Sequence, residues 1–223
     1  MECICLAGGL GTRLQPVLPV TPKCLAPINE RAFLDILLQQ LKRQGISRVI
    51  LSLGYLNEAV VSYIDGREYD ATIDVCIESE PLGTAGGLRL ALAMAIEDHV
   101  VVVNGDTYFD VPLRPLLDFH QAMSADVTLA LKRLQHFDRY GRVEVTEGRV
   151  TGFYEKAYCP DGLVNGGVYV VRKDIQLPVQ GSFEKDYLAQ PGHRVYGREE
   201  VGQFIDIGIP DDYQRAQTLL ADI

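Results

Sequence analysis

The glycine-rich segment near the start of the chain carries the residues with the clearest chemistry. An apolar run from Ile4 to Ala7 leads directly into Gly8-Gly9-Leu10-Gly11-Thr12-Arg13. Glycines let a backbone approach a ligand closely, and successive amides in such a turn form a concavity that binds anions. Arg13 and Lys23 add two cations to this loop, in a chain whose formal net charge is −9. These residue types predict a site that holds phosphates.

The same segment excludes two better-known phosphate loops. A Walker loop closes on Gly-Lys-Ser/Thr, whereas Gly11 is followed by Thr12-Arg13. The dinucleotide fingerprint needs a third glycine after the Gly-x-Gly pair, and Thr12, Arg13 and Leu14 stand there instead. An oxidoreductase that uses a dinucleotide is therefore disfavoured. A glycine-rich strand end that binds nothing stays open as the alternative.

Two aspartates are candidates for holding a metal ion. Asp106 is the first carboxylate after the apolar run Val100–Val103, and Asp206 stands in Phe204-Ile205-Asp206-Ile207-Gly208. A carboxylate among apolar neighbours is costly unless it is paired or coordinates a cation. Beside a phosphate loop, two such groups suggest Mg²⁺, which proteins hold by one or two carboxylates plus substrate phosphates. A turn aspartate and a helix-leading aspartate are the alternative readings.

Further polar and glycine-rich segments lie downstream. Glu80-Pro81-Leu82-Gly83-Thr84-Ala85-Gly86-Gly87 places two glycines at an expected helix start, where either a ligand or a tight helix–sheet contact would explain them. Tyr140-Gly141, Glu155-Lys156 and Asn165-Gly166-Gly167 fall near the ends of expected strands. Lys156 suits a second phosphate, although an exposed lysine needs no ligand. Glu155 and Asn165 suit sugar hydroxyls, whereas turn chemistry alone also accounts for Asn-Gly-Gly.

Length and composition indicate one soluble domain that spans residues 1–223. The chain is 47% hydrophobic and 23% charged, and its acidic balance argues against nucleic acid as a partner. No apolar run approaches the ~20 residues of a membrane-spanning helix, and we expect no membrane partner. Five cysteines without metal-ligand spacing suggest reduced thiols in a cytoplasm. Cys3 and Cys5 should share one buried strand face.

The elements that must position these residues alternate between strand and helix in the first half. The expected strands there are Cys3–Ala7, Val49–Leu53, Thr72–Ile77 and Val100–Asn104. The expected helices are a stripe around 33–41 that ends at Gly45, one around Glu58–Ile64, and one capped by Thr84. This alternation predicts a parallel sheet whose ligand crevice lies beyond the carboxyl ends of the strands.

The second half is expected to be richer in strands. Those strands are Val127–Leu131, Val143–Val145, Val150–Tyr154 and Val164–Val171, with a turn at Glu147-Gly148. Short helices follow near Glu184–Ala189 and from Pro210 to Leu220.

Together these motifs resemble the sugar-1-phosphate nucleotidylyltransferases over essentially the whole chain. The matching segments are Gly8–Leu14 with Pro22-Lys23, Asn104-Gly105-Asp106, Glu155-Lys156, Asn165-Gly166-Gly167 and Phe204 through Gly208. The resemblance implies an α/β fold: a Rossmann-like, mixed and mostly parallel sheet flanked by helices, of the GT-A-like nucleotidyltransferase type. It also implies a nucleotide-binding half at about 1–110 and a sugar-binding half at about 111–223.

The resemblance further implies a role for each site residue. Arg13 would stabilise the transition state and the leaving pyrophosphate, Lys23 would bind the α-phosphate, and Mg²⁺ would lie on Asp106 and Asp206. The implied nucleotide contacts are Leu6, Ala7, Gly8, Gly9, Gly11, Thr12, Glu80, Gly83, Thr84 and Asn104. The implied sugar-phosphate contacts are Gly141, Glu155, Lys156, Asn165 and Gly166.

Four segments are most similar to the D-glycero-α-D-manno-heptose 1-phosphate guanylyltransferases: Glu80–Thr84, Arg139–Gly141, Phe183–Asp186 and Phe204 through Gln217. That similarity implies GTP and a heptose 1-phosphate as substrates and a product used for surface polysaccharide. Uridylyl, cytidylyl or guanylyl transfer to another hexose or amino-sugar 1-phosphate remains an alternative, as does a non-catalytic nucleotide-sugar sensor. A homodimer is considered for the oligomeric state.

Overall fold

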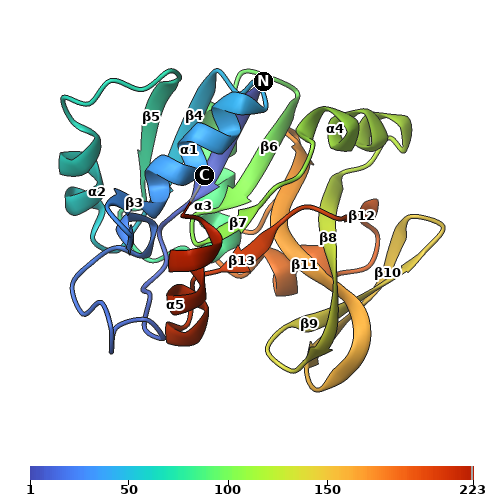
Figure 1. The fold of residues 1–223 in the computed structure, drawn as a ribbon. Coiled ribbons are helices and arrows are strands. Elements are labelled where there is room, and N and C mark those ends of the chain that lie inside the picture. The colour runs from blue at the N-terminus through green and yellow to red at the C-terminus, as the bar shows by residue number, and fades with distance from the viewer. Residues whose placement is uncertain (222) are drawn as a thin grey trace.

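A nine-stranded mixed sheet forms the centre of the protein. The computed structural model describes residues 1–221 and 223, and within them the strand order is β5-β4-β1-β6-β11-β8-β12-β10-β9 (Figure 1). The pairings of β4 with β5, β1 with β4 and β1 with β6 are parallel. β11 is antiparallel to both β6 and β8, β12 is parallel to β8, and β10 is antiparallel to β12 and β9. Only β10 and β11 therefore run against the other strands of this described sheet, which confirms the expected mixed, mostly parallel arrangement.

The first half alternates strand and helix as its sequence indicates. Its elements are β1 (Glu2–Leu6), a 3₁₀ turn η1 (Lys23–Leu25), the short pair β2 (Pro27–Ile28) and β3 (Arg31–Ala32), α1 (Phe33–Arg43), β4 (Arg48–Leu53), α2 (Asn57–Ile64), β5 (Thr72–Ile77), α3 (Gly83–Met94) and β6 (His99–Asn104). Helix α1 ends where expected, because Gly45 follows it with a φ of 84°. The prediction that Thr84 caps α3 is wrong. The cap is Leu82, and the Thr84 hydroxyl instead accepts a hydrogen bond from the Phe183 amide at 2.8 Å.

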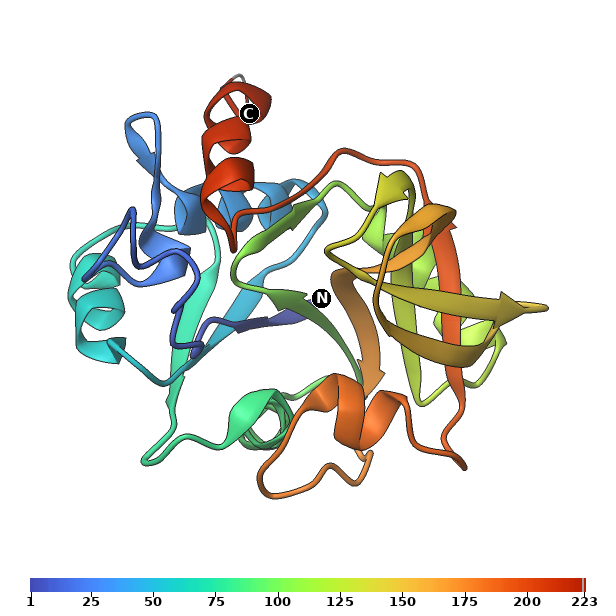
Figure 2. The same ribbon diagram turned by 90° about the horizontal axis from the view of Figure 1, so that it is seen from below.

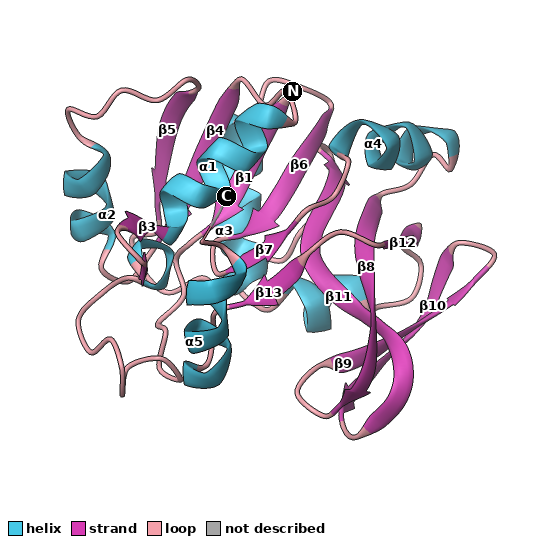
Figure 3. Ribbon diagram, viewed as in Figure 1, coloured by secondary structure: helices cyan, strands magenta, loops and turns pink. Residues whose placement is uncertain are grey.

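The second half contains long strands that twist away from the parallel region (Figure 3). Its elements are β7 (Thr107–Phe109), α4 (Leu113–Ala122), β8 (Val127–Phe137), β9 (Gly141–Thr146), β10 (Arg149–Lys156), β11 (Cys159–Arg172), a single π-helical turn η2 (Glu184–Leu188), β12 (Val195–Glu200), β13 (Phe204–Asp206) and α5 (Pro210–Leu219). Glu147 and Gly148 form the expected turn, both with positive φ. The sequence interpretation missed α4, β7, β12 and β13.

Helices cover both faces of the sheet, and each face has its own apolar cluster. In Figure 2, α1 and α5 lie on one side of the sheet, and α3 and η2 lie on the other. The strand side chains alternate between the faces with the period of two that pleating imposes. Cys3 and Cys5 pack with α1, whereas Ile4 packs with α3. The expected shared face of the two cysteines is confirmed, and among the described residues all five cysteines are free thiols.

Helix length bears on one further expectation. Within residues 1–221 and 223, no helix is both long enough and apolar enough to cross a lipid bilayer.

Candidate active site

A cavity of about 600 Å³ opens at the carboxyl ends of β1, β4 and β6. This is the edge where a parallel α/β sheet binds ligands. The cleft is lined by these residues from the sequence-based prediction: Leu6, Ala7, Gly8, Gly9, Lys23, Glu80, Gly83, Thr84, Asn104 and Asp106. Gly11, Thr12, Arg13, Asp206 and the five expected sugar-phosphate contacts do not line it. The structure therefore brings together most of the expected nucleotide contacts and places the remainder around them.

The glycines of the first loop have distinct surroundings. A Cβ atom on Gly8 would lie 3.0 Å from the amide nitrogen of Gly54, so a side chain would press on the neighbouring strand end. Gly9 has open space around its Cα and lines the cleft. Gly11 has a φ of 66°, and a Cβ there would lie 3.1 Å from Cγ of Lys23. Gly11 thus supports the Lys23 side chain from behind instead of lining the cleft.

Lys23 and Asp106 form an ion pair at the floor of the cleft. The Lys23 Nζ atom donates to Oδ2 of Asp106 at 3.0 Å, and both side chains are largely buried. The Thr107 hydroxyl donates to the other Asp106 oxygen at 3.3 Å. A buried ion pair with further hydrogen bonds has little freedom to move. A cation and an anion are therefore held together at the floor of the cleft.

The second aspartate reaches Asp106 through strand pairing. Strand β13 pairs with β7 so that Asp206 lies opposite Thr107, and the Ile207 amide donates to the Asp106 carbonyl at 2.9 Å. Burial, and then the negative charge of Asp106, raise the pKa of Asp206 to about 6. The Gly208 amide donates to Asp206 at 2.7 Å. Two carboxylates that disfavour each other's charge form a site that a divalent cation would relieve.

The donor set of this pair fits a magnesium ion. No cluster of three or more histidine, cysteine, aspartate or glutamate side chains with metal-binding geometry occurs in residues 1–221 and 223. Two oxygen donors without nitrogen or sulfur are what Mg²⁺ uses when substrate phosphates complete its coordination. Asp106 and Asp206 are thus the residues that would hold it.

Arg13 lies on a turn at the outer side of the loop. Arg13 is exposed, and within the described part of the chain its guanidinium makes no ion pair. Its positive charge nevertheless reaches Asp206, where it is one of the influences that lower the pKa of that carboxyl. Arg13 is therefore an exposed cation whose charge acts on Asp206.

Glu78 is a residue of the cleft that the sequence interpretation missed. Its carboxylate lies against three glycines: a Cβ on Gly8, Gly54 or Gly87 would approach a Glu78 oxygen to 3.3, 3.6 or 2.5 Å, respectively. The Leu82 amide donates to Oε2 at 2.9 Å, which fixes the carboxylate at the cleft wall. Glu80, one of the implied nucleotide contacts, is exposed at the rim of the cleft. Glu78 is the first carboxylate after β5, so the rule that identified Asp106 after β6 also finds Glu78.

The glycines at the start of α3 are explained by packing as well as by the cleft. A Cβ on Gly83 would lie 2.4 Å from the Gly181 carbonyl oxygen, and one on Gly86 would lie 2.3 Å from that of Val179. Gly86 therefore serves a tight contact with the segment before η2. Gly87 makes room for Glu78 and for Ser52 of β4, which is the helix–sheet contact expected for these glycines, and it also lines the cleft.

The Asn-Gly-Gly motif lies inside β11 at a break in its pairing with β8. The register shifts between Asn165 and Tyr169, and Gly167 has a φ of 70°. Bulges of this kind often re-aim side chains beside active sites. A Cβ on Gly167 would lie 2.8 Å from the Asn104 amide nitrogen, which is in the nucleotide cleft. The bulge thus brings the Asn165-Gly166-Gly167 motif next to Asn104 at the end of β6.

Polar groups around Asn165 extend from that bulge. The Asn165 amide donates to the Tyr169 hydroxyl at 2.8 Å and to Glu184 of η2 at 3.5 Å. Tyr169 is buried, which raises the pKa of its hydroxyl. Glu184 is a second polar residue that sequence reasoning did not assign to the site. Gly166 packs on Phe109, because a Cβ there would lie 2.4 Å from the ring.

The remaining sugar-side residues lie on β9 and β10. Gly141 pairs with Lys156 across these strands. Glu155 has 88% of its side chain exposed and lies 3.7 Å from the Lys185 ammonium, and Lys156 is exposed. The structure places these residues beyond the cleft, on the far side of the bulge.

Comparison with known proteins agrees with this geometry. The family model "Nucleotidyl transferase" matches residues 2–221. Two curated relatives are named D-glycero-alpha-D-manno-heptose 1-phosphate guanylyltransferase. The one from Aneurinibacillus thermoaerophilus is 44% identical over 223 residues, covering 97% of each chain. The one from Campylobacter jejuni is 40% identical over 220 residues, covering 96% of this chain and 97% of the relative.

A solved structure shows the same fold over nearly its full length. HddC from Yersinia pseudotuberculosis superposes with a TM-score of 0.88 at 32% identity, covering 98% of this chain and 99% of that one, and it has also been solved in complex with GMP-PN. The cleft, the paired aspartates and these matches lead to one conclusion: the chain belongs to the nucleotidyl transferase family.

Proposed function

We propose that the protein transfers a guanylyl group from GTP to D-glycero-α-D-manno-heptose 1-phosphate and releases pyrophosphate. The observation that carries the transfer chemistry is the pair of carboxylates: Asp106 contacts Lys23 at the floor of the cleft, and Asp206 lies beside Asp106. The substrate pair is supported by the names of the two curated relatives and by the GMP-PN complex of HddC.

The proposed reaction is an in-line displacement at the α-phosphorus of the nucleotide. A sugar-phosphate oxygen forms a new bond to that phosphorus, and the bond to the bridging oxygen of pyrophosphate breaks. A phosphate monoester is largely dianionic near neutral pH, because its second pKa is about 6. The nucleophile therefore needs no general base. The protein's contribution is alignment and neutralisation of charge.

Each cation has a part in that contribution. Lys23 would exchange part of its contact with Asp106 for the α-phosphate, and the exposed Arg13 would meet the leaving pyrophosphate. Mg²⁺ held by Asp106 and Asp206 would supply charge neutralisation on the reacting phosphates when bound. Lys156 would bind the incoming sugar phosphate, and Gly141, Glu155, Asn165 and Gly166 would face the sugar.

Glu78 supports guanine as the base. An ionised carboxylate is an acceptor only, and guanine presents two donors on one edge, the N1–H and the 2-amino group. Uracil presents a carbonyl oxygen on each side of its single N–H, so one of them would face a carboxylate oxygen. With one Glu78 oxygen fixed by the Leu82 amide, the carboxylate is oriented in advance for a donor edge.

The proposal includes a cytoplasmic enzyme that supplies an activated sugar for surface polysaccharide. Free thiols at all five cysteines, each within the described chain, are consistent with a reducing compartment. The acidic net charge and the small-molecule cleft support nucleotide and sugar phosphate as partners, not nucleic acid.

A substrate panel tests the proposal. Pyrophosphate release is measured with GTP, UTP, CTP and dTTP, each against the heptose 1-phosphate and several hexose and amino-sugar 1-phosphates. We expect turnover with GTP and the heptose 1-phosphate, abolished by chelation of divalent metal. Turnover with UTP and none with GTP would reject the base assignment, and no turnover with any pair would favour a sensor. Asp206→Asn and Arg13→Ala should each lose most turnover while the circular dichroism spectrum is unchanged.

A further inference from the structure

Arg139 and Asp212 join two segments that are far apart in the sequence. The Arg139 guanidinium donates to both oxygens of Asp212, with NH1 to Oδ2 at 2.9 Å and NH2 to Oδ1 at 3.2 Å. The Asp212 side chain is only 4% exposed, whereas that of Arg139 is 42% exposed. A two-pronged contact between a guanidinium and a carboxylate fixes orientation as well as distance. The pair therefore defines how its two segments lie against each other.

Asp212 is tied closely to the metal-binding strand. Asp206 ends β13, and Asp212 lies in the first turn of α5, which begins at Pro210. The Gly208 amide donates to Asp206 between them, and Pro210 fixes the backbone at the start of the helix. The Arg139 side chain, which binds Asp212, is thus held at a fixed position relative to Asp206.

Arg139 belongs to the connection between β8 and β9, which leads into the sugar side. The next residues are Tyr140 and Gly141, and Gly141 pairs with Lys156. Among the described residues, the side-chain hydrogen bonds made by the connection 138–140 come from the Arg139 guanidinium. The Tyr140 ring adds an edge contact with Phe204 of β13, at a centroid distance of 5.8 Å. The connection is therefore held against β13 and α5 by two side chains.

We propose that Arg139 is a positioning residue that acts through Asp212 to hold the sugar-phosphate side, Gly141 and Lys156, at a fixed distance from the metal-binding Asp206. This inference rests on the proposed function and adds a residue to it. An in-line displacement requires the incoming phosphate and the α-phosphate to be aligned, and small misplacements reduce rates strongly. The Arg139–Asp212 pair bridges the two halves that carry these groups.

A role in stability alone is the competing explanation, and the chain offers controls for it. Arg215 also contacts Asp212, at 2.9 Å, but it lies one turn away on the same helix and does not reach the β8–β9 connection. Arg133 on β8 has two carboxylate partners, Asp161 of β11 at 2.7 Å and Glu199 of β12 at 2.9 Å, neither of which belongs to β13 or α5. Arg215→Ala and Arg133→Ala therefore remove comparable ion pairs without releasing residues 138–141.

Steady-state kinetics of Arg139→Ala give the first test. We expect KM for the sugar 1-phosphate to rise on the order of tenfold, with KM for the nucleotide unchanged and a loss of melting temperature no larger than that of Arg215→Ala. Arg139→Lys should recover part of the loss, because it restores the charge but not the two-pronged geometry. Arg215→Ala and Arg133→Ala should keep the wild-type KM values. An unchanged sugar KM, or equal losses for both substrates, would overturn the proposal.

A second measurement separates this inference from the proposed function. Amide hydrogen exchange of residues 138–141 should be faster in Arg139→Ala than in wild type, and unchanged in Arg215→Ala, whichever substrate the enzyme uses. If the wild-type protein turns over no substrate pair, the proposed function fails while the exchange result still stands. Unchanged exchange in Arg139→Ala would reject the positioning contact itself. In a double-mutant cycle, Asp212→Asn should have no further effect on sugar KM once Arg139 is alanine.

Discussion

The Lys23 ammonium lies 3.0 Å from the Asp106 carboxylate, and burial, followed by the charge of Asp106, raises the pKa of Asp206. One ammonium therefore stands beside two carboxylates, of which Asp106 lines the cleft. Without the ammonium, the hydrogen bonds from the Thr107 hydroxyl and the Gly208 amide would remain, but the two negative charges would lose their neighbouring positive charge. In the proposed mechanism, the Lys23–Asp106 contact links phosphate binding to the charge state of these two carboxylates.

Substitution of Lys23 by methionine should remove this link while keeping the buried stem of the side chain. We expect kcat/KM to fall by at least about a hundredfold, as for the loss of a preorganised charge at a transition state. The variant should also need less Mg²⁺ for half-maximal rate, because the ammonium that repels the metal ion from Asp106 is gone. Metal titrations of initial rate check both effects. A wild-type rate in Lys23→Met would contradict the assigned role.

Local patterns were sufficient to predict the parallel half of the fold and the floor of its cleft. Asp106 lies just after an apolar run that is easily read, Lys23 belongs to the loop that follows another such run, and the carboxyl ends of parallel strands meet at one edge. The approach of Asp206 to Asp106 depends on pairing between β13 and β7, two strands of three residues each. Strands so short carry no periodic signal, so their pairing could not be read from the sequence.

Three further features of the structure differ from the sequence-based prediction, each for its own reason. Helix α4 was readable, since Leu113, Leu116, Leu117 and His120 are buried at helical spacing after Pro112. Glu78 was readable too, as the first carboxylate after β5, but the room for its carboxylate comes from glycines of three separate segments, which only the fold brings together. The bulge at Asn165 likewise depends on a register shift against β8, which is a property of the assembled sheet.

Glu78→Gln should weaken the preference for guanine. Glutamine keeps the size of the side chain but replaces one acceptor oxygen by a donor, which would face a donor of the base. We expect KM for GTP to rise by about 10- to 100-fold, equivalent to about 1–3 kcal/mol, with the sugar KM unchanged. Glu80→Gln tests the sequence-based expectation for the rim residue in the same assay. A larger rise in KM for GTP in Glu80→Gln than in Glu78→Gln would assign the contact with the base to Glu80 instead.

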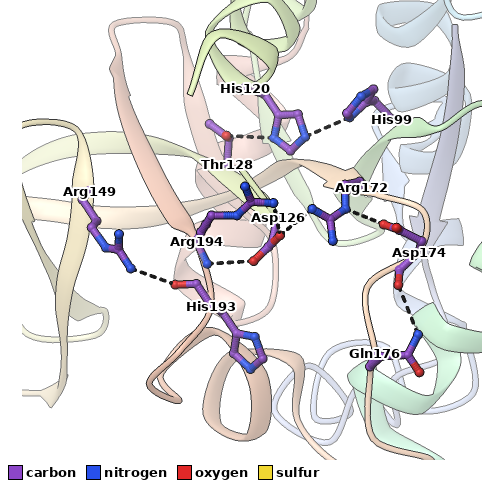
Figure 4. A network of polar contacts seen from close by, with 10 residues as sticks. All are labelled: His99, His120, Asp126, Thr128, Arg149, Arg172, Asp174, Gln176, His193 and Arg194. Carbon is purple, nitrogen blue, oxygen red and sulfur yellow. Dashed lines mark hydrogen bonds and ion pairs between the residues drawn. The ribbon is translucent and has the colours of Figure 1, made fainter. Parts of the chain in front are cut away.

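His120 should make the fold lose stability as the pH falls below neutral. It is fully buried, hydrogen-bonded to Thr128 at 2.9 Å and His99 at 3.1 Å (Figure 4). Burial, and then the charge of His99, lower its pKa to about 4. Because the unfolded pKa is about 6.5, stability should decline from pH 6.5 down to about 4, by at most about 3 kcal/mol. Urea unfolding at several pH values across this range measures the decline in the free energy of unfolding. His120→Leu should flatten the decline, whereas a substitution of the exposed His136 should keep it.

Asp126 should make its own contribution at lower pH. Its side chain accepts from the Arg194 amide at 2.8 Å and from the Arg194 and Arg172 guanidiniums at 3.0 and 2.9 Å (Figure 4). Burial alone would raise its pKa, but these donors and charges outweigh it and hold the pKa below its usual range. The stabilisation is therefore complete above the unfolded pKa of about 3.9 and is lost as the pH falls through the lower folded pKa.

Asp126→Ala tests that contribution at neutral pH. The variant leaves the Arg172 and Arg194 guanidiniums without their shared carboxylate, where the starts of β8 and β12 meet the end of β11. Since both arginines are partly exposed, we expect a loss of about 2 kcal/mol in the free energy of unfolding, below the value for a fully buried pair. Asp174→Ala is the matched control, because Asp174 also pairs with Arg172 but is 75% exposed. Equal losses in the two variants would show that burial of Asp126 adds nothing to the network.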